Sequence, residues 1–345
     1  MDRGNAKITF DEVGDIFRSE EKGLLETLAR SAQEVTRQYF GRAVALYAPL
    51  YLSNFCGNKC AYCGFQASRH VERKKLSSGE IEKECAALAA TGIRSCLLLT
   101  GESRFHSPPS YIKEAITIAG KYFANIGIEV YALETGEYRE LYRAGADGVT
   151  LFQETYDRAR YDEVHLAGPK KNYDYRVNAP ERIAQAGFRQ ISMGVLLGLA
   201  DWRRDVVSLF EHLRHMERKY PGVEYTLSFP RLRPVADDKR AYVEVSDRDM
   251  VKIMCVARLL FPRAGINLST RETAEFRDHA VELGVTKISA GSLTSVGGYG
   301  DPKREAHRDG QFEVHDARSL AEIKSMLLRH GFDPVVTDWR NIVNE

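Results

Sequence analysis

Long apolar runs are missing from this sequence of 345 residues. A membrane-spanning helix needs about 20 consecutive apolar residues, whereas the most apolar runs, 96–99 and 193–200, have only the length of buried strands. The N-terminus offers no signal peptide either, since residues 1–7 are polar and lead into no apolar segment. We therefore expect a cytoplasmic protein that does not act at a membrane.

An excess of charge of one sign is also absent. The sequence has 49 Lys and Arg against 48 Asp and Glu, which leaves a net charge of +1. Proteins that bind nucleic acid or an anionic surface usually carry a clear basic excess, so neither partner is expected. Hydrophobic residues make up 43% of the chain and charged residues 28%, which is enough apolar material for a large core and excludes a disordered chain. No linker, low-complexity segment or short repeat divides the sequence.

Cysteines are few and unevenly spread. Three of the six, Cys56, Cys60 and Cys63, lie within eight positions. The other three stand alone along the chain, at Cys85, Cys96 and Cys255. A secreted disulfide framework would spread its cysteines more evenly over a shorter chain. We expect a reduced setting in which the clustered cysteines bind a metal and the others are buried in the core.

Short apolar segments alternate with amphipathic stretches, as strands and helices do. The expected strands are 43–52, 95–100, 128–133, 148–153, 190–199, 224–229, 265–269 and 287–290. The expected helices between them are 77–90, 110–122, 137–144, 179–186, 203–219, 247–261 and 273–283. Several helices end in a glycine that precedes a strand, which is typical of a helix returning to a parallel sheet. Eight strands with helical returns predict an α/β fold, a (β/α)8 barrel of the TIM type, with a doubly wound open sheet as the alternative.

This pattern divides the chain into three parts. Residues 1–42 form a helical N-terminal extension, in which apolar residues recur at helical spacing up to Tyr39 and Gly41 closes the helix. Residues 43–300 form the barrel. Residues 301–345 form a C-terminal tail, with one helix expected at 319–330 that packs on the barrel.

The clustered cysteines directly follow the first expected strand. In a barrel this is the rim where active sites lie, and thiolates bind iron–sulfur clusters or zinc. A cubane cluster has four irons and this loop supplies three sulfurs, so one iron has no local protein ligand and is open to a small molecule. A structural zinc site with His70 as fourth ligand is the alternative, although such sites usually draw on two separated ligand pairs.

The spacing Cys56-x3-Cys60-x2-Cys63, with Tyr62 before the last cysteine, resembles the signature of the radical S-adenosylmethionine (SAM) superfamily. The resemblance implies a 4Fe–4S cluster held by the three cysteines, with Tyr62 beside the cofactors. It implies that the open iron binds the amino and carboxylate groups of SAM. It also implies that an electron from the cluster releases a 5′-deoxyadenosyl radical.

Further motifs occupy the segments 48–54, 99–102, 152–156, 165–170, 173–176, 197–203, 228–234, 268–272, 289–292 and 297–299. Together they resemble the 2-iminoacetate synthases (ThiH), the tyrosine lyases of thiamine-thiazole biosynthesis. A related tyrosine lyase, HydG, matures FeFe-hydrogenase and carries a C-terminal Cys-x2-Cys pair, whereas no cysteine follows Cys255 here. This departure favours the thiamine enzyme. A HydG-like maturase without that cluster domain and a tryptophan lyase-like enzyme are the alternatives.

The resemblance assigns several residues at expected strand ends to SAM. The stretch Thr100-Gly101-Glu102 is expected along the methionine moiety, where Gly101 lets the backbone approach closely. Glu154 and Arg176 also resemble SAM contacts, because a carboxylate suits the ammonium or the ribose hydroxyls and a guanidinium suits the carboxylate. Glu134 is a further candidate. For each carboxylate a salt bridge at the rim is the alternative.

The substrate side needs a carboxylate clamp and a pocket for a phenol. Arg271, just after an expected strand, is the candidate clamp, because a bidentate guanidinium fixes the orientation of a carboxylate as well as binding it. Ser228 and Ser289 are candidate hydroxyl donors. Arg231 and Arg233 are either further contacts or structural anchors.

The resemblance implies cleavage of the Cα–Cβ bond of L-tyrosine. The products are 2-iminoacetate (dehydroglycine) and p-cresol, with 5′-deoxyadenosine and methionine from SAM. An electron donor such as flavodoxin or ferredoxin is implied, and a thiazole synthase (ThiG-like) partner, because 2-iminoacetate hydrolyses readily. The basic run Arg73–Lys75 is either a solvated face or a docking point for an acidic electron donor.

Overall fold

The structure is a computed structural model that describes residues 8–21, 23–233, 242–300 and 310–337. Eight of its parallel strands close into a ring: β1 (Ala43–Ser53), β2 (Ser95–Thr100), β3 (Asn125–Glu129), β4 (Gly148–Glu154), β5 (Gln190–Val195), β6 (Glu224–Ser228), β7 (Gly265–Leu268) and β8 (Lys287–Ser289). Neighbours in the ring follow chain order, and β1 pairs with both β8 and β2. The closed ring confirms the predicted (β/α)8 barrel and excludes an open doubly wound sheet.

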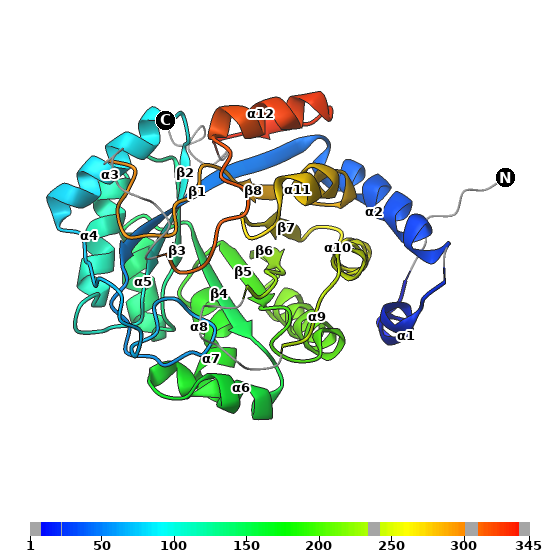
Figure 1. The fold of residues 1–345 in the computed structure, drawn as a ribbon, viewed down its shortest axis with the longest axis horizontal. Helices are drawn as coiled ribbons and strands as arrows, with labels where there is room; N and C mark the ends of the chain where they lie inside the picture. The colour runs from blue at the N-terminus through cyan, green and yellow to red at the C-terminus, as the bar shows by residue number, and fades with distance from the viewer. Residues whose placement is uncertain (1–7, 22, 234–241, 301–309, 338–345) are drawn as a thin grey trace.

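Helices surround the barrel on its outer side (Figure 1). They are α3 (Ser78–Ala90), α4 (Pro109–Ala119), α5 (Thr135–Arg143), α6 (Arg158–Val164), α7 (Tyr173–Val177), α8 (Ala179–Gln185), α9 (Trp202–Lys219), α10 (Asp247–Leu260) and α11 (Ala274–Ala280). In α9, for example, Val206, Leu209 and Leu213 recur at helical spacing and are buried. Among the described residues, no helix combines the length and the apolar composition that crossing a bilayer demands.

Two helices precede the barrel, as expected for the N-terminal extension: α1 (Val13–Arg18) and α2 (Leu24–Phe40). In α1, Phe17 is fully buried and its ring lies edge-on to Trp202 with 5.1 Å between ring centroids. Lys252 of α10 donates to the carbonyl oxygen of Ser19 at 2.8 Å. The extension therefore covers the α9 and α10 side of the barrel (Figure 1).

A ninth strand, β9 (Asp333–Val335), pairs in parallel with the start of β1. It follows α12 (Leu320–Arg329), the predicted C-terminal helix. The sequence did not predict β9, because three residues that include Pro334 show no alternation to recognise. Residues 301–309 and 338–345 of the predicted tail lie outside the described residues, so its boundary at 301 stays a prediction.

The region around β3 and β4 differs from the expectation in two places. β3 ends at Glu129, whereas the apolar segment 128–133 suggested a later strand. Val130, Tyr131 and Leu133 are buried but continue as an irregular segment after the strand. The chain between β4 and β5 also carries two short helices, α6 and α7, before α8. Both differences change which side chains reach the rim of the barrel.

The interior of the barrel is hollow. Interiors of such barrels are usually filled by branched apolar side chains, but many positions here carry small or neutral polar residues: Gly127, Gly148, Thr150, Ser192, Thr226, Ser228, Asn267 and Ser289. A cavity of about 220 Å³ results. It extends from the cysteine loop at the rim to Asn125 and Gln190, the first residues of β3 and β5.

Arg258 supports the two strands that close the barrel. Its guanidinium is fully buried and donates to the carbonyl oxygens of Pro262 at 3.0 Å, Ala264 at 2.6 Å and Gly284 at 2.8 Å, ahead of β7 and β8. We expect Arg258→Met to lower the free energy of unfolding by at least about 3 kcal/mol, because three buried carbonyls lose a charged donor. Urea unfolding measures the change. Arg263→Met, at an exposed position nearby, is the control, and an equal loss there would contradict the assignment.

Candidate active site

The cysteine loop begins where β1 ends, at the rim of the barrel. It pairs with the segment that follows α6, since Ala61 donates to the carbonyl oxygen of Val164 and Lys59 to that of Ala167, both at 2.9 Å. It also pairs with the end of β2, since the amide of Gly57 donates to the carbonyl oxygen of Glu102 at 2.8 Å. The loop is therefore fixed by main-chain bonds to the end of β2 and to the end of α6 with the segment after it.

Arg73 holds the loop from within. Its guanidinium donates to the carbonyl oxygens of Asn54 at 2.6 Å, Phe65 at 2.8 Å and Gln66 at 2.6 Å. Lys75 lies over the ring of Tyr111, with 4.2 Å from its Nζ to the ring centroid. The basic run that we expected on a solvated face or at a docking point is thus engaged in intramolecular contacts.

Gly101 is needed for the loop to approach β2. A Cβ atom at this position would lie 2.4 Å from the carbonyl oxygen of Phe55 and 3.2 Å from the Cβ of Cys56. No other residue fits without moving the cysteine loop. The close backbone approach predicted for Gly101 is thus present, and the cysteine loop is what lies against it.

The three clustered cysteines all line the cavity, and none forms a disulfide. Burial raises the pKa of Cys60 to about 12 and also raises the pKa of Cys63. Such thiols become thiolates when a metal replaces their proton. Within the described ranges no three His, Cys, Asp or Glu side chains are gathered closely enough to hold one metal ion. A cubane cluster does not require that gathering, because each cysteine binds a different iron.

Glu154 lies at the end of β4 and has a strained backbone conformation, which its neighbours must hold in place. Its φ of +74° is the one positive value for a non-glycine residue among the described residues, and the β4–β5 register shifts at this point. Its carboxylate accepts from Lys170 Nζ at 2.6 Å and lies 3.6 Å from the guanidinium of Arg176. The positive charges of Lys170 and Arg176 outweigh the effect of burial and lower the pKa of Glu154. Backbone strain of this kind concentrates at functional sites.

Asn58 connects the cysteine loop to this ion cluster. Its side-chain amide donates to the Glu102 carboxylate at 2.6 Å, and its side-chain oxygen accepts from the amide of Lys170 at 2.9 Å. Gly168, with a φ of +97°, fits closely against it, since a Cβ there would lie 2.3 Å from the Asn58 side-chain oxygen. Glu102, Glu154 and Lys170 thus meet at one side of the cavity mouth.

Tyr62 lines the cavity beside the cysteines. Its hydroxyl is hydrogen-bonded to Nε2 of His165 at 2.8 Å, and the other ring nitrogen of His165 lies 2.8 Å from the carbonyl oxygen of Tyr161. Burial lowers the pKa of His165 to about 3, so the imidazole is neutral. With Nδ1–H donating to Tyr161, Nε2 accepts the hydroxyl proton of Tyr62 and fixes its ring.

The proposed substrate residues lie across the mouth and below it. Arg271 lines the cavity, and its guanidinium stacks on the ring of Phe312 at 3.6 Å from the centroid. In the described part of the chain this guanidinium has no hydrogen bond or ion pair. Ser228 and Ser289 also line the cavity, and the Ser289 hydroxyl is buried without a partner.

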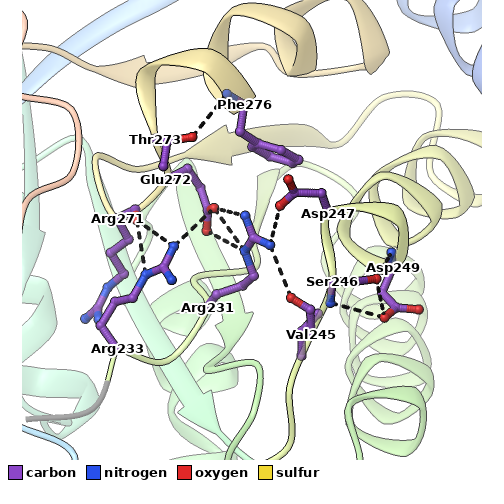
Figure 2. A network of polar contacts seen from close by, with 10 residues as sticks. All are labelled: Arg231, Arg233, Val245, Ser246, Asp247, Asp249, Arg271, Glu272, Thr273 and Phe276. Atoms are coloured by element: carbon purple, nitrogen blue, oxygen red, sulfur yellow. Dashed lines mark hydrogen bonds and ion pairs between the residues drawn. The ribbon is translucent and has the colours of Figure 1, made fainter.

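Arg231 and Arg233 are structural anchors (Figure 2). Arg231 is hydrogen-bonded through two nitrogens to Glu272, which is 1% exposed, and reaches Asp247 at 2.6 Å. Arg233 donates to the carbonyl oxygen of Arg271 at 3.1 Å. The network holds the main-chain carbonyl of Arg271 and the side chain of Glu272, and it does not engage the guanidinium of Arg271 (Figure 2).

The structure does not bring every candidate to the cavity. Thr100, Gly101, Glu102, Glu154 and Arg176 line it. Glu134, in contrast, is exposed at the start of α5 and does not line it.

The sequence analysis gave no role to four residues that the structure places at the site: Asn58, Glu129, His165 and Lys170. A charged residue in an otherwise apolar segment, as at Glu129, was the available signal.

The Gly297–Tyr299 loop is held in place, because the amides of Gly298 and Tyr299 both donate to Glu84.

Comparison with known proteins defines the class first. Residues 50–212 match the radical SAM superfamily, and residues 228–333 match the Biotin and Thiamin Synthesis associated domain. A barrel that carries three cysteines on the loop after β1, beside a polar cavity, is that of a radical SAM enzyme.

The particular family follows from the most similar relatives. The 2-iminoacetate synthases of Salmonella typhimurium and Escherichia coli are each 38% identical over 335 residues, which cover 97% of this chain and 88% of the relative. The chain belongs to the 2-iminoacetate synthase family. A crystal structure of HydG, the FeFe-hydrogenase maturase, superposes with a TM-score of 0.90 at 35% identity and covers 97% of this chain and 74% of the maturase.

The residues present fit a 4Fe–4S cluster and SAM, the cofactors of this superfamily. Three thiols that line the cavity suit the three protein ligands of such a cluster, and the Thr100 hydroxyl is buried without a partner among the described residues. The charged groups of Glu102, Glu154, Lys170 and Arg176 suit the amino and carboxylate groups of SAM.

Replacement of the clustered cysteines tests the cluster site. After anaerobic reconstitution with iron and sulfide, we expect Cys60→Ala to lose the visible absorption and most of the iron, because one corner of the cluster loses its ligand. Cys255→Ala, in the core, is the matched control and should bind iron as the wild type does. A brown Cys60→Ala protein with a full iron content would contradict the assignment.

Lys170→Met tests the ion cluster at Glu154. Loss of its nearest cation leaves a buried carboxylate with only Arg176 at 3.6 Å. We expect the affinity for SAM to fall about tenfold or more and the free energy of unfolding to fall by about 2 kcal/mol. Equilibrium binding of SAM to the reconstituted protein measures the first effect. Lys171→Met, one residue along and exposed, should change neither quantity.

Proposed function

We propose that this chain cleaves the Cα–Cβ bond of L-tyrosine to 2-iminoacetate and p-cresol, for the thiazole of thiamine. The observation that carries the proposal is the arrangement of the mouth: the cysteine loop, an ion cluster around Glu154 and the unpaired guanidinium of Arg271 all face one hollow barrel. The 38% identity with 2-iminoacetate synthases over nearly the whole chain supports it.

The cofactors supply the difficult chemistry, because the cluster bound to SAM is the source of a 5′-deoxyadenosyl radical. Cys56, Cys60 and Cys63 hold the cluster, and Tyr62 packs beside it. Glu102, Glu154 and Arg176, together with Thr100 and Gly101, bind the polar groups of SAM. Lys170 holds the Glu154 carboxylate in place.

The remaining residues orient the substrate. Arg271 binds the carboxylate of tyrosine, and its stacking on Phe312 limits the positions that the guanidinium can adopt. The phenol then extends into the barrel, where neutral polar groups such as Ser289, Asn267 and Thr226 surround it. Burial in this cavity keeps solvent from reactive species. Ser228 lies on the wall between these two ends.

The exposed end of α5 does not suit Glu134 for a contact with SAM, so we leave it out of the proposed site. The proposal includes three further expectations from the family resemblance. The enzyme works in the cytoplasm, takes its electron from a flavodoxin or ferredoxin, and passes 2-iminoacetate to a thiazole synthase.

An anaerobic product assay tests the proposed function. The reconstituted protein is incubated with SAM, dithionite and either L-tyrosine or L-tryptophan. We expect p-cresol and 5′-deoxyadenosine from tyrosine and no indole product from tryptophan. Indole products without p-cresol would show that the substrate is tryptophan and not tyrosine.

Arg271→Gln tests the carboxylate clamp. The variant keeps a polar side chain that is shorter, and it loses the charge and the bidentate geometry of the guanidinium. We expect kcat/KM for tyrosine to fall at least about a hundredfold, mainly through KM, with SAM binding unchanged. Arg263→Gln, an exposed arginine before β7, is the control. Unchanged tyrosine turnover in the Arg271 variant would remove this residue from the substrate site.

A further inference from the structure

Glu129 has a half-buried carboxylate inside the barrel for which the proposed function has no role. It is the last residue of β3, and its side chain lines the cavity at the level of the mouth, beside Leu99 of β2. In the described part of the chain no group is hydrogen-bonded or ion-paired with it. A buried carboxylate without a partner is costly, so a ligand that supplies one would bind favourably.

The other carboxylates around the mouth already have partners. Glu154 is paired with Lys170 and Arg176, and Glu102 with Asn58. Glu272 is paired with Arg231 and Arg233 (Figure 2). Among the described residues, the carboxylate of Glu129 and the guanidinium of Arg271 are the charged groups at the mouth that have neither a hydrogen bond nor an ion pair.

These two groups face each other across the barrel. In the ring of eight strands, β3 and β7 are separated by four steps in either direction, so they are opposite. Glu129 ends β3, and Arg271 follows β7 by three residues. No ion pair joins them, yet each is near enough to influence the pKa of the other. An anion and a cation held apart across a cavity match the two charged groups of an amino-acid zwitterion.

The charge distribution along the cavity fixes which end of tyrosine lies there. Below the mouth the cavity is lined mainly by neutral polar groups, from Tyr47, Thr150, Ser192 and Asn267, together with the cation Lys287 at the start of β8. The Asn267 side-chain oxygen is buried without a hydrogen bond, and the Asn267 amide donates to the Tyr47 hydroxyl at 3.1 Å. A neutral phenol suits that part, and the charged end of the amino acid suits the mouth.

We infer that Glu129 binds the α-ammonium group of the substrate while Arg271 binds its carboxylate. The inference rests on the proposed function, because it takes tyrosine as the substrate. Two opposite contacts to groups on one carbon fix the position of the amino nitrogen relative to the mouth of the barrel. Glu129 thereby distinguishes an amino acid from the same molecule without its amino group.

The titration of Glu129 agrees with this role. Burial and the negative charge of Glu154 raise its pKa to about 7, against the lowering effects of Arg271, Lys170 and Arg176. Burial, together with the negative charge of Glu129, raises the pKa of the Tyr47 and Tyr51 hydroxyls. Among the described residues no cation is in direct contact with this carboxylate, and a substrate ammonium would provide that contact.

Binding to the reconstituted enzyme with SAM, without reductant, tests the inference. The variants are wild type, Glu129→Gln and, as control, Glu140→Gln on the exposed side of α5. The ligands are L-tyrosine, 3-(4-hydroxyphenyl)propanoate, which lacks the amino group, and L-phenylalanine, which lacks the hydroxyl. Isothermal titration calorimetry gives each Kd, and Glu129→Asp reports whether a shorter carboxylate restores part of the affinity.

We expect Glu129→Gln to weaken tyrosine about tenfold or more and to leave the affinity for the propanoate nearly unchanged. The preference for tyrosine over phenylalanine and the affinity for SAM should stay as in the wild type. An unchanged preference for tyrosine over the propanoate would overturn the inference. A lost preference over phenylalanine would place Glu129 at the phenol, and a lost affinity for SAM would place it in the SAM site, and either result overturns it. If the wild type forms no p-cresol, the proposed function itself is at fault.

Discussion

The packing of the cysteine loop on the end of β2 and the end of α6 is the constraint on which this site depends. A loop with three metal-binding thiols is useful only if its position relative to the barrel is fixed. Its position is fixed by main-chain hydrogen bonds to Glu102 and Val164 and by the hydrogen bonds from Arg73 to carbonyl oxygens of the loop. The absence of a side chain at Gly101 allows the close approach. Asn58 extends the same packing to Lys170, and through Lys170 to Glu154. One packing arrangement therefore positions both the cluster ligands and the residues for SAM.

The second requirement is a barrel interior that is not filled. Glycine, serine and threonine at inward positions lose the apolar packing that normally stabilises this fold. The outer shell compensates with buried contacts, of which the Arg258 hydrogen bonds and the α1 contact with Trp202 are examples. The cavity that remains has several charged groups at its mouth and mainly neutral polar groups below, with Lys287 as an exception.

Much of this could be predicted from the sequence, because strong local signals carried it. Apolar strands, glycines after helices and the cysteine spacing predicted the barrel, the position of the cluster loop and the family. The end of β3 is a place where such signals did not predict the correct carboxylate at the cavity. The apolar segment 128–133 suggested a strand that ends beside Glu134, but the strand ends at Glu129, and the cavity carries that carboxylate instead. Lys170 was missed because its contact with Glu154 depends on the path of the chain through α6 and α7, which no periodicity reveals.

The central claim is that three cysteines leave one corner of the cluster to SAM. Electron paramagnetic resonance of the anaerobically reconstituted and reduced protein, with and without SAM, tests this most directly. The account predicts the signal of a reduced 4Fe–4S cluster whose shape changes when SAM is added, because the cofactor becomes a ligand of the open iron. A cluster signal that SAM leaves unchanged, or no cluster signal at all, would contradict it.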